Sequence, residues 1–100
     1  MKAYGPRQAY RAIAKTVTFR LDAPKAREVL LVIRLAKENV PSTRAMSQTV
    51  DGAWSLRTEL PRGRYVYRFM VDGTPVPDPT ALGSMTDEHG GQWSTREIGY

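Results

Sequence analysis

Three turn signals frame two strand-like runs between residues 51 and 79, and their order restricts the fold more than any other feature of this 100-residue chain. The Asp-Gly pairs at 51–52 and 72–73 are typical of tight turns, in which glycine takes a positive φ without a Cβ clash. The Pro-Arg-Gly sequence at 61–63 lies between them and indicates a third reversal. The pattern therefore predicts a β-hairpin whose second strand begins at residue 64.

The run from residue 64 to 71 alternates between two faces, as a β-strand does. One face carries Tyr65, Tyr67, Phe69 and Val71, and the other carries Arg64, Val66, Arg68 and Met70. We expect the aromatic face to pack in the core together with Trp54. For Arg68, which points the other way, a solvated charge is the favoured interpretation, and a donor at the rim of a ligand site is the alternative.

The remainder of the chain also reads as short strands, with no strong helical pattern. Strand-like runs stand at 16–22, 29–33, 46–50, 53–60 and 93–98. The apolar run VLLVI at 29–33 predicts a central strand covered on both faces, whereas 36–45 reads as a surface loop. The proline- and glycine-rich stretch at 74–91 predicts little regular structure. Together these patterns predict an all-β antiparallel β-sandwich.

Length and composition favour one compact domain. We expect residues 1–15 to form an N-terminal arm and residues 16–100 to form the sandwich. The chain has no cysteine, so disulfides and thiolate chemistry are excluded. No apolar run approaches the roughly 20 residues of a membrane span, and the first residues lack the apolar core of a secretion signal. These observations predict a cytoplasmic protein without a membrane partner.

The chain is basic, with a formal net charge of +5, mostly from arginine. The positive residues are scattered, and no run of four or more occurs. Net charge bears on solubility and nonspecific association before it bears on function. A solvated basic surface is therefore favoured over a nucleic-acid site, and no RNA-recognition, cold-shock or helix-turn-helix signature is present.

Candidates for catalysis are few. His89 is the only histidine, and its acidic neighbours Asp87 and Glu88 would point in different directions on an extended loop. Asp72 and Asp78 each stand where a turn favours aspartate. No nucleophile elbow, phosphate-binding glycine loop or zinc motif occurs. We therefore expect no enzymatic activity, no catalytic residue, no metal site and no cofactor.

The order of motifs resembles a known family. G-x-W is followed by P-x-G-x-Y-x-Y-[KR]-F-x-V-D-G and then by D-P, a combination similar to the glycogen-binding and isoamylase N-terminal modules, carbohydrate-binding family 48. The matching residues are Gly52, Trp54, Pro61, Gly63, Tyr65, Tyr67, Arg68, Phe69, Val71, Asp72, Gly73, Asp78 and Pro79. The resemblance covers residues 16 to 98 and implies an immunoglobulin-like early-set β-sandwich that binds α-glucan.

The sequence keeps only part of the sugar site that this resemblance implies. Arg68 matches the basic position of the family. The loop that usually carries one tryptophan has Glu38 or Asn39 there, Pro75 replaces a second tryptophan, and Trp93 or Ser94 replaces an asparagine.

The candidate carbohydrate contacts are Trp93, Arg68, Asn39 and Gln92. A flat ring can pack on the apolar face of a sugar, with polar groups at its rim. For Trp93, packing at the edge of the sandwich is the favoured interpretation, and an accessible ring is the alternative.

These departures predict weak binding of glycogen or starch chains by a noncatalytic module. Each lost ring platform is worth about 1–3 kcal/mol by analogy with base stacking on aromatic side chains. The alternative is a protein-interaction or accessory module, including one that self-associates, which keeps the fold without the sugar site.

Overall fold

The computed structural model describes residues 14–99, and within them all regular structure is β. The strands are β1 (Lys15–Asp22), β2 (Val29–Leu35), β3 (Ser42–Ala45), β4 (Ser47–Gln48), β5 (Ala53–Leu60), β6 (Gly63–Val71), β7 (Thr74–Val76), β8 (Gly83–Thr86) and β9 (Gln92–Ile98). This part of the chain has no helix of the length and apolarity that a membrane crossing requires. The N-terminal arm predicted at 1–15 falls almost entirely outside the described residues and stays a prediction.

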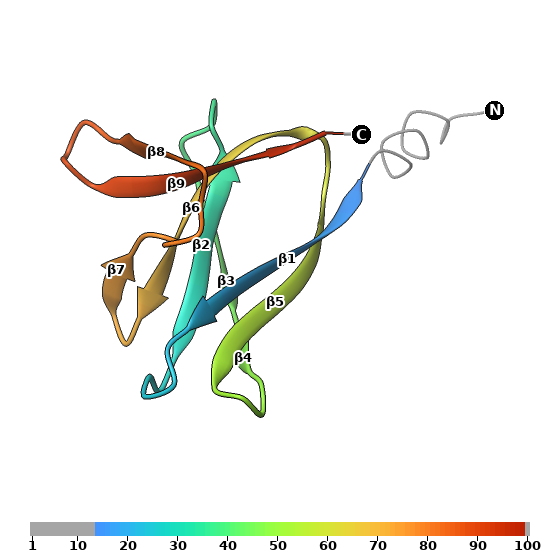
Figure 1. Cartoon of the computed structure of the whole chain (residues 1–100). Helices are drawn as coiled ribbons and strands as arrows, with labels where there is room; N and C mark the ends of the chain where they lie inside the picture. Colours follow the sequence, from blue (N-terminus) through green and yellow to red (C-terminus); the bar gives the residue numbers. More distant parts are fainter. Residues whose placement is uncertain (1–13, 100) are drawn as a thin grey trace.

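The strands form two antiparallel sheets that face each other (Figure 1). The smaller sheet has the order β1-β5-β4. The larger has the order β3-β2-β6-β9-β8, with β7 paired to β6. The predicted all-β, immunoglobulin-like early-set sandwich is confirmed.

The core lies between the sheets and is built from the inward side of each alternating strand. In β1, Val17, Phe19 and Leu21 are buried, while the residues between them are exposed. Phe19 meets Tyr67 of β6 edge-to-face, with ring centroids 4.9 Å apart, a geometry that aromatic pairs favour. Strand pairing within each sheet and apolar contact between the sheets therefore stabilise the same arrangement.

Two of the three predicted reversals are hairpin turns. Gly52 (φ 90°) joins β4 to β5, and Asp72 (φ 50°) with Gly73 (φ 85°) joins β6 to β7. Two positive φ values in succession are the geometry of a tight hairpin turn. The Asp72 carboxylate also accepts hydrogen bonds from the backbone N–H groups of Arg27 and Glu28, which ties this turn to the start of β2.

The third reversal corrects the sequence prediction. Strands β5 and β6 do not form a hairpin, because β5 pairs with β1 and β4 while β6 lies in the other sheet. The connection at residues 61–62 carries the chain from one sheet to the other. Both strands place apolar residues inward in either arrangement, so alternation alone does not distinguish a hairpin from a crossing between sheets.

Three further predictions about strands were wrong. The segment 36–45 contains β3, and the segment 74–91 contains β7 and β8. Strand β7 is short and pairs only with β6. Such an edge strand tolerates Pro75, which has no backbone N–H to donate. Strand β2 is not covered on both faces, since Leu30 and Val32 are only half-buried. The central strand of the larger sheet is β6, which pairs with β2, β7 and β9.

Candidate functional site

Two arginines and a tryptophan meet on the outer face of the larger sheet. The β6–β9 register pairs Tyr67 with Ser94, so the next step along the strands brings Arg68 opposite Trp93. Arg34 of β2 is two residues beyond the partner of Arg68 and on the same face. The Cζ atom of Arg68 lies 4.1 Å from the centroid of the Trp93 ring, and that of Arg34 lies 5.3 Å from it. We call these three side chains the arginine–tryptophan cluster.

Trp93 is held in place by Asp87. Its indole Nε1 donates to Asp87 Oδ2 at 2.9 Å, and the backbone N–H groups of His89 and Gly91 donate to Oδ1 at 2.9 and 2.8 Å. These bonds, the indole one above all, hold the pKa of the Asp87 carboxyl below its usual range. The carboxylate thus stays charged through neutral pH and fixes the orientation of the ring.

Gly91 leaves the space in which Asp87 and Arg68 approach each other. A Cβ atom at this position would lie 2.8 Å from Asp87 Oδ2 and 3.0 Å from Arg68 Nη1. Both distances are shorter than ordinary van der Waals contact, so any larger residue would displace one of the two side chains. Gly91 is therefore part of how the cluster is assembled.

Trp93 is almost fully covered although it lies outside the core. Only 6% of the residue is exposed, and it is absent from the apolar cluster between the sheets. The predicted alternatives were an accessible ring or packing at the edge of the sandwich, and the structure has the ring on the outer face beneath guanidinium groups. A sugar that approached this face would meet the arginines before the indole.

The two arginines are anchored differently. Arg34 Nη1 donates to the carbonyls of Leu35, Ala36 and Glu38, at 3.3, 3.1 and 2.7 Å. Arg68 is half-buried, and its Nε has no hydrogen-bond partner among the described residues. Stacking on the indole is therefore what positions Arg68, and the outer nitrogens of its guanidinium are available to a ligand.

The other predicted contacts do not join the cluster. Asn39 is exposed on the connection between β2 and β3, one residue after the Glu38 carbonyl that binds Arg34. Gln92 is exposed at the start of β9, and as the neighbour of Trp93 it directs its side chain to the opposite face of the strand. Sequence reasoning missed Arg34. Its position two residues after Val32, on the same face of an alternating strand, was the available signal.

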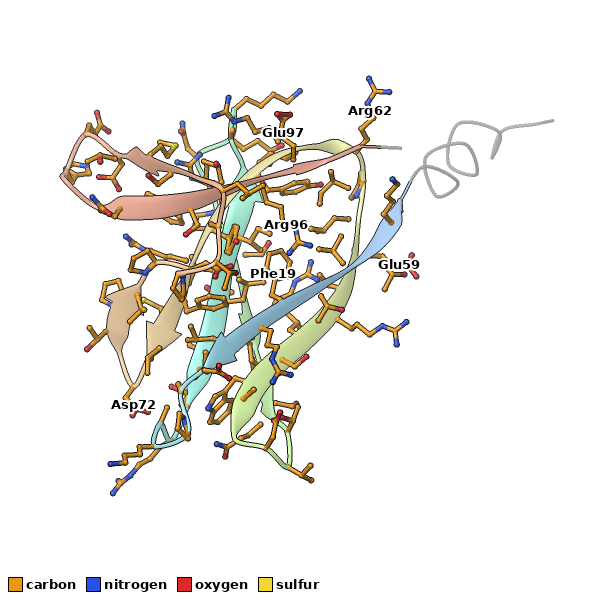
Figure 2. The ribbon with its side chains drawn as sticks, viewed as in Figure 1. Phe19, Glu59, Arg62, Asp72, Arg96 and Glu97 are labelled. Atoms are coloured by element: carbon orange, nitrogen blue, oxygen red, sulfur yellow. The ribbon has the colours of Figure 1, made fainter. Side chains whose placement is uncertain are left out.

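A second feature is a cleft of about 760 Å³ between β1 and β9. It is lined by Thr18, Arg20, Asp78, Leu82, Thr95 and Arg96, among others. Figure 2 shows Phe19 and Arg96 in the space between the sheets on this side. Arg96 Nη1 donates to the Thr18 carbonyl at 3.1 Å, and its guanidinium lies 5.0 Å from the Phe19 ring centroid.

Asp78 is one of the residues that line this cleft. Its Oδ1 accepts bonds from the backbone N–H and hydroxyl of Thr80, which confirms the turn predicted here. The Tyr67 hydroxyl donates to Oδ2 at 2.6 Å. Burial, together with this carboxylate, raises the pKa of the Tyr67 hydroxyl far above its ordinary value. Asp78 thus has a structural role in joining the 78–82 connection to β6.

The histidine and acidic side chains of residues 14–99 are dispersed. No group of three or more His, Asp or Glu side chains converges there in a way that could hold a metal ion. His89 is exposed, and its Nε2 lies 3.8 Å from the neighbouring Glu88.

Comparison with known proteins shows which proteins share this fold. No family model matches the chain. Over 70 residues, 65% of the chain, it is 41% identical to a 1,4-α-glucan branching enzyme of Lactobacillus acidophilus. A pullulanase from Paenibacillus barengoltzii superposes with a TM-score of 0.58 and 27% identity over 81% of the chain. The chain has the early-set β-sandwich fold and is similar to one domain of these α-glucan enzymes.

Other structures of the same kind agree. The early-set domain superposes on PulA of Klebsiella pneumoniae with a TM-score of 0.57 and 28% identity over 93% of its length. It spans only a small part of these proteins: 11% of the branching enzyme, 14% of the P. barengoltzii pullulanase and 10% of PulA. The similarity thus concerns one domain of larger enzymes.

Proposed function

We propose that this early-set domain is a noncatalytic accessory module that binds α-glucan chains such as glycogen or starch. Its similarity to a domain of α-glucan enzymes supports this, and structures of the P. barengoltzii pullulanase are complexes with maltotetraose and maltotriose. The observation that carries the proposal is the Arg68 guanidinium stacked 4.1 Å from the Trp93 ring on the outer face. Arg68 occupies the basic position that the family resemblance implies for sugar contact.

Binding is proposed to be weak. Pro75 and the loop around Asn39 offer no aromatic ring, and Trp93 lies under two guanidinium groups. Each absent platform costs about 1–3 kcal/mol, and about 1.4 kcal/mol changes affinity tenfold. The remaining contacts are donors from Arg68 and Arg34, with Asn39 as an exposed amide on the β2–β3 connection, whereas Gln92 faces the other side of β9. We therefore expect dissociation constants in the millimolar range.

A titration with maltoheptaose tests the proposal. The Trp54→Phe variant leaves Trp93 as the only tryptophan, so its fluorescence reports on the cluster alone. Maltoheptaose at millimolar concentration should change that fluorescence and shift the amide resonances of β6 and β9. Arg68→Gln should weaken the response, whereas Arg57→Gln, on an exposed position of β5, should leave it unchanged. Absence of any shift at these concentrations would reject glucan binding.

A protein-interaction module is the second candidate, and the cleft beside β1 favours it. Among the described residues β1 pairs only with β5, so one edge of β1 is not covered by a neighbouring strand. Leu82, at the rim of this cleft, is fully exposed. Exposed strand edges and apolar side chains are common points of protein contact. Sedimentation that depends on protein concentration and is reversed by Leu82→Ser would support it.

A further inference from the structure

The arginine–tryptophan cluster holds more positive charge than neighbouring carboxylates offset. Arg34 and Arg68 share the face of a single indole, at 5.3 and 4.1 Å. Within residues 14–99, neither makes an ion pair. Like charges gathered at one ring repel each other, while each is attracted to the face of the ring.

The Asp87 carboxylate beside Arg68 is already engaged. Asp87 accepts bonds from the Trp93 indole and from two backbone N–H groups, so its acceptor capacity is directed away from the guanidinium groups. It lies near Arg68, since both approach Gly91, and it balances one of the two positive charges. One positive charge therefore remains on the outer surface of the cluster.

The available hydrogen-bonding groups are all donors. Arg34 bonds to the protein through Nη1 alone, which leaves its other nitrogens without a bond in the described residues. Within residues 14–99 the Arg68 side chain donates no hydrogen bond, and its orientation is set by stacking. A sugar hydroxyl is best bound by a donor and an acceptor together. Paired guanidinium groups instead match the several acceptor oxygens of a phosphate.

We infer that the cluster recognises a phosphate monoester carried on the α-glucan, in preference to the unmodified chain. This inference rests on the proposed glucan-binding function and specifies the substrate class of the same site. The phosphate oxygens accept hydrogen bonds from Arg34 and Arg68 while the adjoining sugar packs beside them. An inorganic phosphate ion offers the same oxygens without the sugar, so the test must separate the two sources.

The experiment compares maltoheptaose, maltoheptaose phosphorylated at one glucose C6, glucose 6-phosphate and inorganic phosphate. Binding is followed by Trp93 fluorescence in the Trp54→Phe variant at low salt. We expect the phosphorylated maltoheptaose to bind about tenfold or more tightly than the neutral one, since charge-assisted hydrogen bonds are roughly twice as strong as neutral ones. This preference should decline as salt increases, because exposed charges are screened.

Matched variants test which arginines produce the preference for the phosphorylated chain. Arg68→Gln and Arg34→Gln should each reduce the preference for the phosphorylated chain several-fold, and Arg68→Lys should restore part of it by charge without the planar fork. Arg57→Gln removes the same charge from the other sheet and should leave the preference intact. Unchanged melting curves and amide spectra would establish that each variant folds.

Equal affinity for both maltoheptaoses would overturn the phosphate inference while leaving glucan binding in place. Binding of inorganic phosphate as tight as that of the phosphorylated chain would also overturn it, because the site would then select the anion alone. If no glucan binds in either form, both the inference and the proposed function fail.

Discussion

The two tryptophans of this domain are equally buried in different surroundings. Trp54 is 7% exposed and Trp93 is 6% exposed. Trp54 belongs to the apolar cluster between the sheets, and its indole donates to the Ala23 carbonyl at 2.9 Å. Trp93 lies on the outer face, and its indole donates to a carboxylate beneath stacked guanidinium groups. Burial by packing and burial by flexible charged side chains give the same exposed fraction.

The difference matters for function because the groups that cover the two indole rings differ in how easily they move. The ring of Trp54 is enclosed by residues fixed in both sheets. The ring of Trp93 is covered by arginines whose stems have several rotatable bonds and whose heads are partly hydrated. A ligand can therefore displace a guanidinium from the Trp93 ring without opening the core.

The largest expected effect distinguishes the two tryptophans by stability. Trp54→Ala should lower the free energy of unfolding by about 3–5 kcal/mol, since it leaves a cavity between the sheets. Trp93→Ala should cost only about 2 kcal/mol, because the arginines can collapse into the space and water can enter. Urea denaturation of both variants measures this. Equal losses would mean that the outer face is packed like the core.

A smaller effect is expected at Gly91. In Gly91→Ala the new Cβ would meet Asp87 Oδ2 at 2.8 Å and Arg68 Nη1 at 3.0 Å, which should cost about 1–3 kcal/mol. The indole N–H resonance of Trp93 should shift, while that of Trp54 should not. Gly99→Ala is the control, since nothing lies within 4 Å of a Cβ there. A Trp93 resonance that remains in place would show that Asp87 and Arg68 can accommodate the methyl group.

Removing one guanidinium should have a still smaller effect on stability. Arg68→Gln removes a partly hydrated cation–π contact and should cost about 0.5–1 kcal/mol. Its clearer consequence is access to the ring: acrylamide should quench Trp93 more efficiently in Arg68→Gln, measured with Trp54→Phe in the background. Quenching that equals that of the parent would indicate that Arg34 alone covers the indole.

The smallest effect is a change with pH. The lowered pKa of Asp87 means that its contribution to stability is fully present above the unfolded value, about 3.9, and is lost as pH falls through the folded value. The Trp93 indole N–H resonance should therefore stay constant from about pH 8 to about pH 4.5 and move only at lower pH. The Trp54 resonance is the internal control because its acceptor, a backbone carbonyl, does not titrate.

The candidate site was partly predictable. Alternation along 64–71 is enough to direct Arg68 away from the core, and Trp93 stands beside a glycine pair that marks a turn. The sequence does not reveal that Arg34 joins them, because this depends on β2 lying beside β6. It also misleads about Gln92 as a sugar contact. Gln92 precedes Trp93 directly in the chain and therefore faces the other side of β9.

The sequence by itself determined the longer alternating strands, such as β1 and β6, and which face of each turns inward, together with the tight turn at Asp72. These features depend on side-chain period and on local φ preferences, which act over a few residues. Only the tertiary structure decided that β5 and β6 enter different sheets and that Arg34, Arg68 and Trp93 meet. Strand partners are chosen by contacts between distant segments, and the same inward-facing pattern is compatible with several of them.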